Sequence, residues 1–121
     1  MRAVVRHEYG GSEVLRVAER DLPAPERDQV YVRVAAAGVN MADWHLMTGL
    51  PRVSRIAFGP GRPRRHGLGI DLLGTVEAVG PDVTALRPGD RVLGGGDGAF
   101  AEVAVTRGRR LVALPAGVDD A

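Results

Sequence analysis

Cysteine is absent from the 121 residues of this chain, and its absence removes several kinds of chemistry. Without thiols the protein can form no disulfide, has no cysteine nucleophile and offers no thiolate to a metal ion. Every cysteine-ligated zinc site is therefore excluded. A chain of this composition is expected in the cytoplasm.

Lysine is also absent, so all 16 basic residues are arginine. Together with the many alanine, glycine and valine residues, this usage is typical of a GC-rich bacterial genome and says nothing about chemistry. Five arginines lie between Pro51 and His66, a stretch without an acidic residue: Arg52, Arg55, Arg62, Arg64 and Arg65.

The sequence around these arginines, from Leu50 to Leu68, is rich in proline and glycine and predicts a long irregular loop. Loops of this length are usually functional or mobile. A nucleic-acid surface is not favoured, because the string RPRRH has no interleaved aromatic residue and no helix is predicted to carry it.

Long apolar runs are missing too. No stretch approaches the roughly 20 apolar residues that a membrane-spanning helix needs, so no membrane partner is expected. The N-terminal sequence MRAVVRHEYG carries charges at Arg2, Arg6 and Glu8, which argues against a signal peptide.

The chain has the length of one domain, residues 1–121, which would bury roughly 65% of its unfolded surface. Its alternating apolar residues and turn signals predict about seven short strands and one clear helix, typical of a mainly β barrel or sandwich. The strands are expected at Ala3–Arg6, Val14–Glu19, Gln29–Ala37, Gly69–Gly80, Arg91–Leu93, Ala99–Thr106 and Leu111–Leu114. Gly10 and Gly11 are expected to form the hairpin turn between the first two strands.

The longest regular strand, Gln29–Ala37, is predicted to have one buried and one wet face. Val30, Val32 and Val34 would point to the core, and Tyr31 and Arg33 to solvent. The strand Gly69–Gly80 contains an interior glycine, Gly74, which marks a bulge or a close approach of two backbones.

The segment from Ala35 to Gly49 is the best candidate for a site. Small residues end a strand, Gly38 allows a turn, and a short helix is predicted to start at Asn40. A polar residue at a helix N-terminus lies beside unpaired backbone N–H groups. Asp43, Trp44 and His45 follow on the same helix.

The glycine-rich sequence GGGDGA has Gly94, Gly96 and Ala99 at the spacing of a dinucleotide-binding fingerprint. A period-two strand pattern follows it, whereas the fingerprint requires a helix whose N-terminus receives the pyrophosphate. The context therefore argues against a nucleotide site at this loop.

Six motifs occur in order between Met1 and Val118: MRAVV with GG and VLRV, VRVAAAGVNMADW, LGIDLLGTVEAVGPDV, LRPGDRV, GDGAFAEV and LVALPAGV. In this order the chain resembles the N-terminal catalytic domain of the medium-chain dehydrogenase/reductase superfamily, in its zinc-independent quinone oxidoreductase and enoyl reductase branch. The resemblance implies a GroES-like, partly open β-barrel. It also implies a Rossmann nucleotide-binding domain, which this sequence lacks and which is expected in cis or in trans.

Three departures from the zinc-dependent members carry the assignment to the zinc-independent branch. Asn40 stands where those members have a cysteine ligand, and Gly69-Ile70-Asp71 corresponds to their Gly-His-Glu motif. Ala42 replaces their proton-relaying serine or threonine. Neither an amide nor an alkyl group competes for zinc with thiolate and imidazole, so no catalytic zinc is expected.

The resemblance implies reduction of a quinone, an enone or a related activated double bond by hydride from a nicotinamide cofactor, with NADP(H) expected. Asn40 is the expected catalytic and cofactor-contacting residue, since its amide could donate to the developing oxygen or to the nicotinamide. The alternative is that Asn40 only caps the helix.

Four further side chains complete the expected site. His45 could donate a proton at neutral pH, or could be a partly buried polar residue without a chemical role. Trp44 is expected to line the cofactor and substrate cleft, together with Asp43 and Ile70. Many quinone reductases have Tyr and Arg where this chain has His45 and Met47.

A second class of function stays open, that of a non-catalytic GroES-like domain used for binding or assembly. A co-chaperonin of that fold needs a mobile loop with an apolar tripeptide, whereas the loop here is arginine-rich. Without a covering domain, the face around Trp44 and Ala36 is expected to be exposed, which favours homo-oligomers.

Overall fold

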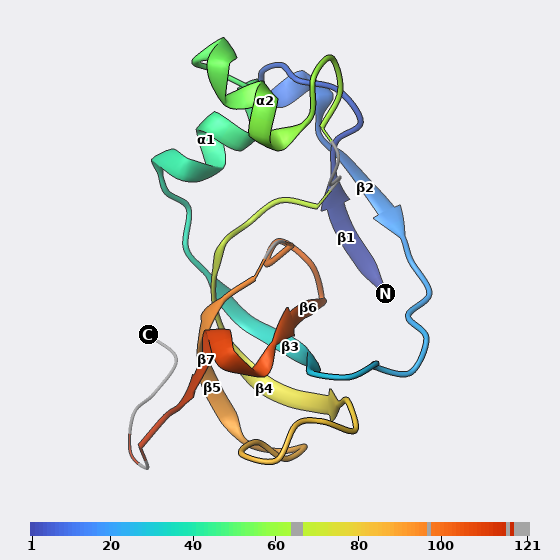
Figure 1. Cartoon of the computed structure of the whole chain (residues 1–121), viewed down its shortest axis with the longest axis vertical. Helices are drawn as coiled ribbons and strands as arrows, with labels where there is room; N and C mark the ends of the chain where they lie inside the picture. The colour runs from blue at the N-terminus through green and yellow to red at the C-terminus, as the bar shows by residue number, and fades with distance from the viewer. Residues whose placement is uncertain (64–66, 97, 116, 118–121) are drawn as a thin grey trace.

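The computed structural model describes residues 1–63, 67–96, 98–115 and 117, and within them the chain forms two antiparallel sheets (Figure 1). A two-stranded sheet has the order β1-β2, and a five-stranded sheet has the order β6-β3-β4-β5-β7. The strands are β1 (Arg2–Val5), β2 (Arg16–Glu19), β3 (Gln29–Ala37), β4 (Asp71–Val79), β5 (Arg91–Gly95), β6 (Val103–Arg107) and β7 (Leu111–Ala113). The helices are α1 (Met41–Thr48) and α2 (Arg55–Phe58), with 3-10 turns η1 (Ser12–Val14), η2 (Arg52–Ser54) and η3 (Gly108–Arg110).

This architecture confirms the predicted mainly β, partly open barrel with seven strands. The larger sheet curves through the lower part of the molecule, and α1 and α2 lie at the opposite end (Figure 1). The sheets do not close on each other. The core lies within the larger sheet and consists of Val30, Val32, Leu72, Val76, Leu86, Val92, Ala99, Ala104 and Leu111.

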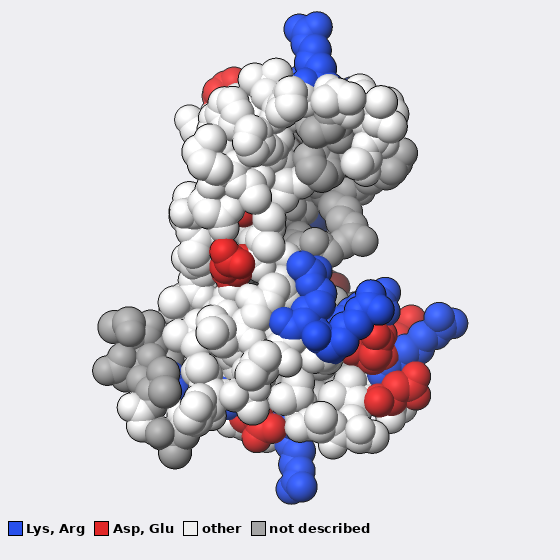
Figure 2. All heavy atoms as spheres, turned by 60° about the vertical axis from the view of Figure 1, so that its left-hand side comes forward, with Lys and Arg blue, Asp and Glu red and all other residues white. Residues whose placement is uncertain are grey.

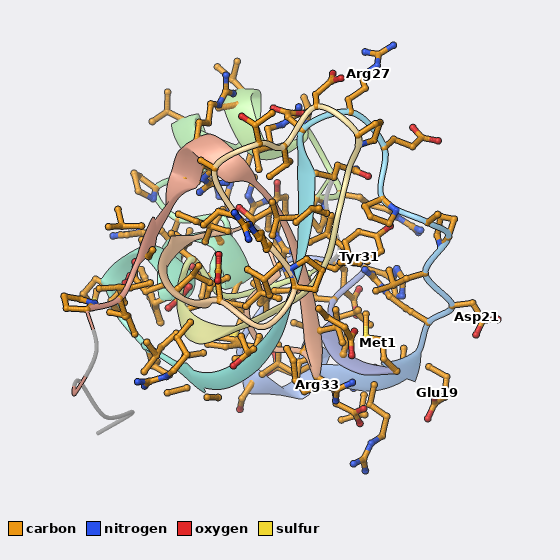
Figure 3. All side chains as sticks on the ribbon, turned by 90° about the horizontal axis from the view of Figure 1, so that it is seen from below. Met1, Glu19, Asp21, Arg27, Tyr31 and Arg33 are labelled. Atoms are coloured by element: carbon orange, nitrogen blue, oxygen red, sulfur yellow. The ribbon has the colours of Figure 1, made fainter. Side chains whose placement is uncertain are left out.

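The central strand β3 begins and ends at the predicted residues, and Arg33 is exposed as expected, but Tyr31 on the same predicted face is buried. Tyr31 is 7% exposed, and its hydroxyl donates to the carbonyl oxygen of Pro23 at 2.7 Å. The connection between β2 and β3 therefore covers the strand at Tyr31 and leaves Arg33 exposed. Figure 3 shows Tyr31 pointing toward that connection, while Asp21 and Arg27 point away from the sheet.

Gly74 in β4 shows why the interior glycine is needed. A Cβ atom there would lie 2.2 Å from the carbonyl oxygen of Arg33, so the two backbones meet too closely for any side chain. Register shifts interrupt the β3–β4 pairing between Tyr31 and Val32 and between Val34 and Ala36. The predicted close approach is confirmed, and it coincides with an irregular ladder.

The prediction for the second strand was partly wrong. Val14 belongs to η1 and β2 begins only at Arg16, because the chain makes a 3-10 turn that buries Val14 to 8% exposure. Gly10 and Gly11 lie in a longer connection rather than a two-residue hairpin turn. The Gly10 N–H donates to the carbonyl of Met47, the penultimate residue of α1.

Two further predictions need correction. The stretch Ala99–Thr106 is a strand only from Val103, since its first residues cross between the sheets and donate to Gly69, Leu68 and Arg2 carbonyls. The loop Leu50–Leu68 is not wholly irregular, because η2 and α2 carry Arg52 and Arg55. Arg64 and Arg65 lie outside the described residues.

Candidate functional site at the N-terminus of α1

The site is built where β3 passes into α1. Asn40 has an extended backbone (φ −139°, ψ 177°) and is the N-cap of the helix. Its Oδ1 accepts the Ala42 N–H at 2.9 Å, and the Asp43 carboxylate accepts the Asn40 N–H at 2.9 Å. This reciprocal capping box satisfies backbone donors that the first helical turn leaves unpaired.

The Asn40 side chain also contacts β4. Its Nδ2 donates to Asp71 Oδ2 at 2.7 Å, a charge-assisted bond across 31 residues of sequence. The Gly38 N–H donates to the Asp71 carbonyl at 3.2 Å and holds the two strand ends together. The amide of Asn40 is thus fixed at both ends, and Nδ2 keeps a second hydrogen for which the described residues offer no acceptor.

Asp43 is 5% exposed, so the carboxylate that completes the capping box is buried. Its Oδ2 is used by Asn40, and among the described residues Oδ1 has no hydrogen-bond partner. Unpaired N–H groups at a helix N-terminus favour a negative charge there. Buried Asp43 therefore accepts the backbone N–H of Asn40, and exposed Asp71 accepts the side-chain amide of Asn40.

Trp44 and His45 form an edge-to-face pair with centroids 5.1 Å apart and planes at 77°. The His45 Nδ1–H donates to the Leu50 carbonyl at 2.5 Å, so Nε2 is the ring nitrogen that this hydrogen bond does not use. Trp44 is 42% exposed and is not a core residue.

Ile70 is half-buried and directly precedes Asp71. Its carbonyl accepts the Gly96 N–H at 2.7 Å. The structure therefore joins Asn40, Asp43 and Asp71 in one hydrogen-bonded group and Trp44 with His45 in a ring contact, whereas Ile70 is connected to the first group as the chain neighbour of Asp71.

The opposite end of α1 depends on residues that the sequence interpretation missed. Arg55 donates from Nε to the Gly49 carbonyl at 3.0 Å and from a terminal nitrogen to the Thr48 carbonyl at 3.2 Å. Its guanidinium lies 4.6 Å from the centroid of the Tyr9 ring. An arginine shortly after a helix C-terminus is a capping signal, and it was overlooked because Arg55 was grouped with the loop arginines.

Arg6 is a second missed residue. It is 2% exposed, and it donates to the Leu46 carbonyl at 3.3 Å and to the Gly67 carbonyl at 3.1 Å. Burial lowers the pKa of this guanidinium from its usual value. Arg6 links the end of β1 to α1 and to the segment before β4, so three parts of the chain hold the helix.

Among the described residues, no group of three or more His, Asp or Glu side chains is placed to hold a metal ion. Within the same residues, no helix has the length and apolar character to cross a membrane.

Three features together are those of a GroES-like barrel domain. The larger sheet is open, a capped helix follows its central strand, and Gly74 permits two of its strands to approach closely. A family model described as the alcohol dehydrogenase GroES-like domain matches residues 26–116. The chain therefore belongs to this family, which confirms the resemblance carried by the six motifs.

The curated relatives include quinone oxidoreductases. The protein from Lama guanicoe is 36% identical over 123 residues, covering 98% of this chain and 35% of its own length. The protein from Pseudomonas aeruginosa is 40% identical over 113 residues, covering 92% of this chain and 32% of its own length. A crystal structure of Escherichia coli quinone oxidoreductase complexed with NADPH matches with a TM-score of 0.84 at 27% identity, covering 98% of this chain and 35% of that one. This chain thus spans about a third of the length of these relatives.

Proposed function

We propose that this chain is the substrate-side catalytic domain of an NAD(P)H-dependent oxidoreductase that reduces a quinone, an enone or a related activated double bond without zinc. The similarity to quinone oxidoreductases supports this function, as does the NADPH in the Escherichia coli structure. Because the chain spans about a third of those proteins, a Rossmann domain in cis or in trans is the proposed partner. The cytoplasm is the proposed location.

One observation carries the proposal: the amide of Asn40 is held between Ala42 and Asp71, with one N–H left to give. Asn40 and Trp44 are both exposed and lie four residues apart at the start of α1, which supports a site for a flat, amide-bearing ring such as nicotinamide. When bound, NADP(H) would supply the hydride. The chain's own part is to orient Asn40 so that its N–H reaches the oxygen on which negative charge develops.

His45 is the proposed proton donor. Its Nδ1–H stays on the Leu50 carbonyl, so donation occurs from Nε2 when the ring is protonated. Trp44 packs edge-on against the same ring and would keep bulk water from one side of it. Asp43 and Ile70 are proposed to shape the cleft wall around this pair.

Zinc does not fit this donor set. Asn40 uses its oxygen on Ala42, and Ile70 offers no ligand atom. We expect less than one zinc per ten chains after dialysis, measured by elemental analysis, whereas one zinc per chain would contradict the proposal.

The decisive test uses the complete enzyme, with the nucleotide-binding domain joined to this chain. Asn40→Ala is expected to lower turnover on a quinone or an enone by about 10²-fold, the scale of one lost oxyanion donor. Asn40→Ser is the matched control for helix capping, because serine caps about as well as asparagine but lacks the amide.

We expect Asn40→Ser to keep the helix cap but to lose the bond to Asp71, so it should unfold about 1 kcal/mol below the wild type while losing about as much turnover as Asn40→Ala. If both variants retained turnover, Asn40 would act only as a helix cap and the proposed catalytic role would be wrong.

A further inference from the structure

A second feature of the domain lies away from Asn40. A cavity of about 670 Å³ opens between the two sheets, and β1 and β6 contribute much of its wall. None of Asn40, Asp43, Trp44, His45 and Ile70 lines it. The proposed reduction chemistry therefore leaves this cavity without a role.

The charged side chains around the cavity are all of one sign. Four arginines line it, Arg20, Arg107, Arg109 and Arg110, and no acidic residue among the described ones does. Arg107 forms an exposed ion pair with Asp28 at 2.7 Å, so one of the four arginines already has an acidic partner. Arg20 and Arg109 are exposed and have no ion-pair partner among the described residues.

Most of the other lining side chains are apolar, although Gln29 and Thr106 also line the cavity. β1 and the segment around β6 contribute short aliphatic side chains, and Leu22 adds a larger one: Ala3, Val4, Ala101, Val103 and Val105 are the others. Ala3 and Val103 are 5% and 4% exposed, so the floor belongs to the packed interior. A cavity with an apolar floor and positively charged arginines around it suits a ligand that has a negatively charged end and an apolar end.

We propose that this cavity binds a small organic oxyanion, with a phosphate or carboxylate head at Arg20 and Arg109 and an apolar body on the strand floor. Guanidinium groups hold oxyanions through paired, charge-assisted hydrogen bonds. The volume lies within the roughly 300–1,000 Å³ range of small-molecule pockets and is far larger than an inorganic ion requires.

The test is calorimetric titration of the whole chain with hexyl phosphate, which combines the two proposed features in one molecule. Inorganic phosphate and hexanol are the comparison ligands, since each has one feature only, and hexanoate tests the carboxylate head. We expect hexyl phosphate to bind at least about tenfold tighter than inorganic phosphate or hexanol, and to weaken as salt is added.

Arg20→Gln and Arg109→Gln remove the two unpaired charges and are each expected to weaken hexyl phosphate binding about tenfold, the scale of a lost charged hydrogen bond. Arg87→Gln is the matched control, because Arg87 is exposed, carries the same charge and does not line the cavity. Circular dichroism of each variant checks that the fold is kept.

Three results would overturn the proposal. These are no binding of hexyl phosphate, equal binding of inorganic phosphate or hexanol, and an effect of Arg87→Gln as large as that of the cavity variants. The experiment needs no turnover, so its outcome is independent of the role proposed for Asn40.

Discussion

At the scale of single residues, Asn40 illustrates how one side chain serves structure and proposed chemistry together. Its oxygen caps α1, and one amide hydrogen is given to Asp71. Only the remaining hydrogen is available to a ligand. An alanine at this position removes all three interactions, which is why the serine variant is needed to separate stability from turnover.

Tyr31 offers a test of the buried face of β3. Its hydroxyl donates to Pro23, and burial raises its pKa above the usual value of 10.0. The folded state therefore favours the neutral phenol. The stability that comes from keeping this phenol neutral is fully present below pH 10 and is lost as the pH rises through the pKa of Tyr31 in the folded state.

We expect Tyr31→Phe to lower the free energy of unfolding by about 1 kcal/mol at pH 7 and to reduce the loss of stability above pH 10. Urea unfolding between pH 7 and 11 measures both effects. The chain has two tyrosines, no cysteine and no lysine, so few other side chains titrate near pH 10. The same alkaline decline in both proteins would contradict the assignment.

At the scale of elements, the sequence predicted the strands and helices that can be recognised from neighbouring residues. The alternation of Val30, Val32 and Val34 located β3 to the residue, and Asn40 marked the start of α1. The turn η1 and the helix α2 were missed because distant contacts hold them. Val14 is buried by tertiary packing, and Arg55 bonds to carbonyls of a different helix.

The site was predictable to a similar extent. The residues around Asn40 are consecutive and were named from the sequence, but the bond to Asp71 depends on how β3 pairs with β4. Two register shifts interrupt that pairing, so the partner of Asn40 could not be found by counting along two regular strands.

Arg55 gives a testable prediction at the C-terminus of α1. We expect Arg55→Met to lower the free energy of unfolding by about 2 kcal/mol and to speed hydrogen exchange in the last turn of α1, since two charged hydrogen bonds and a ring contact are lost. Thermal unfolding and amide exchange are the measurements.

Arg52→Met is the control for the loss of one positive charge near the helix, because Arg52 is exposed on η2. An equal effect of the two substitutions would show that charge alone, and not the bonds to Thr48 and Gly49, stabilises this end of α1.

At the scale of the whole molecule, large apolar side chains gather on the segment that carries the site. Six of them are exposed between Val39 and Ile56, a set named here the helical apolar surface: Val39, Met41, Trp44, Leu50, Val53 and Ile56. Few charged side chains appear on the upper part of the molecule in Figure 2, where Figure 1 places α1 and α2. Exposed apolar residues concentrated in this way are typical of an interaction surface.

The isolated chain is expected to fold, to lack turnover and to self-associate through the helical apolar surface. Val53 and Ile56 are 69% and 72% exposed, so replacing both with Asp should cost little stability and shift the chain toward the monomer in sedimentation velocity. Val17→Asp is the control, because Val17 is 71% exposed but lies on β2. Association that persists in the double variant would place the contact elsewhere.

The position of β3 between β4 and β6 has a consequence for how the site responds to ligands. Ladder hydrogen bonds on both sides make β3 a strand whose amides are expected to exchange only when the whole domain opens. Asn40 follows this strand closely, whereas the segment from Leu50 to Gly59 is held by short turns and side-chain bonds. The start of α1 is therefore preorganised during folding and the connection after its C-terminus is the more compliant part, so a movement on ligand binding is expected to begin in that connection while the Asn40 amide stays in place.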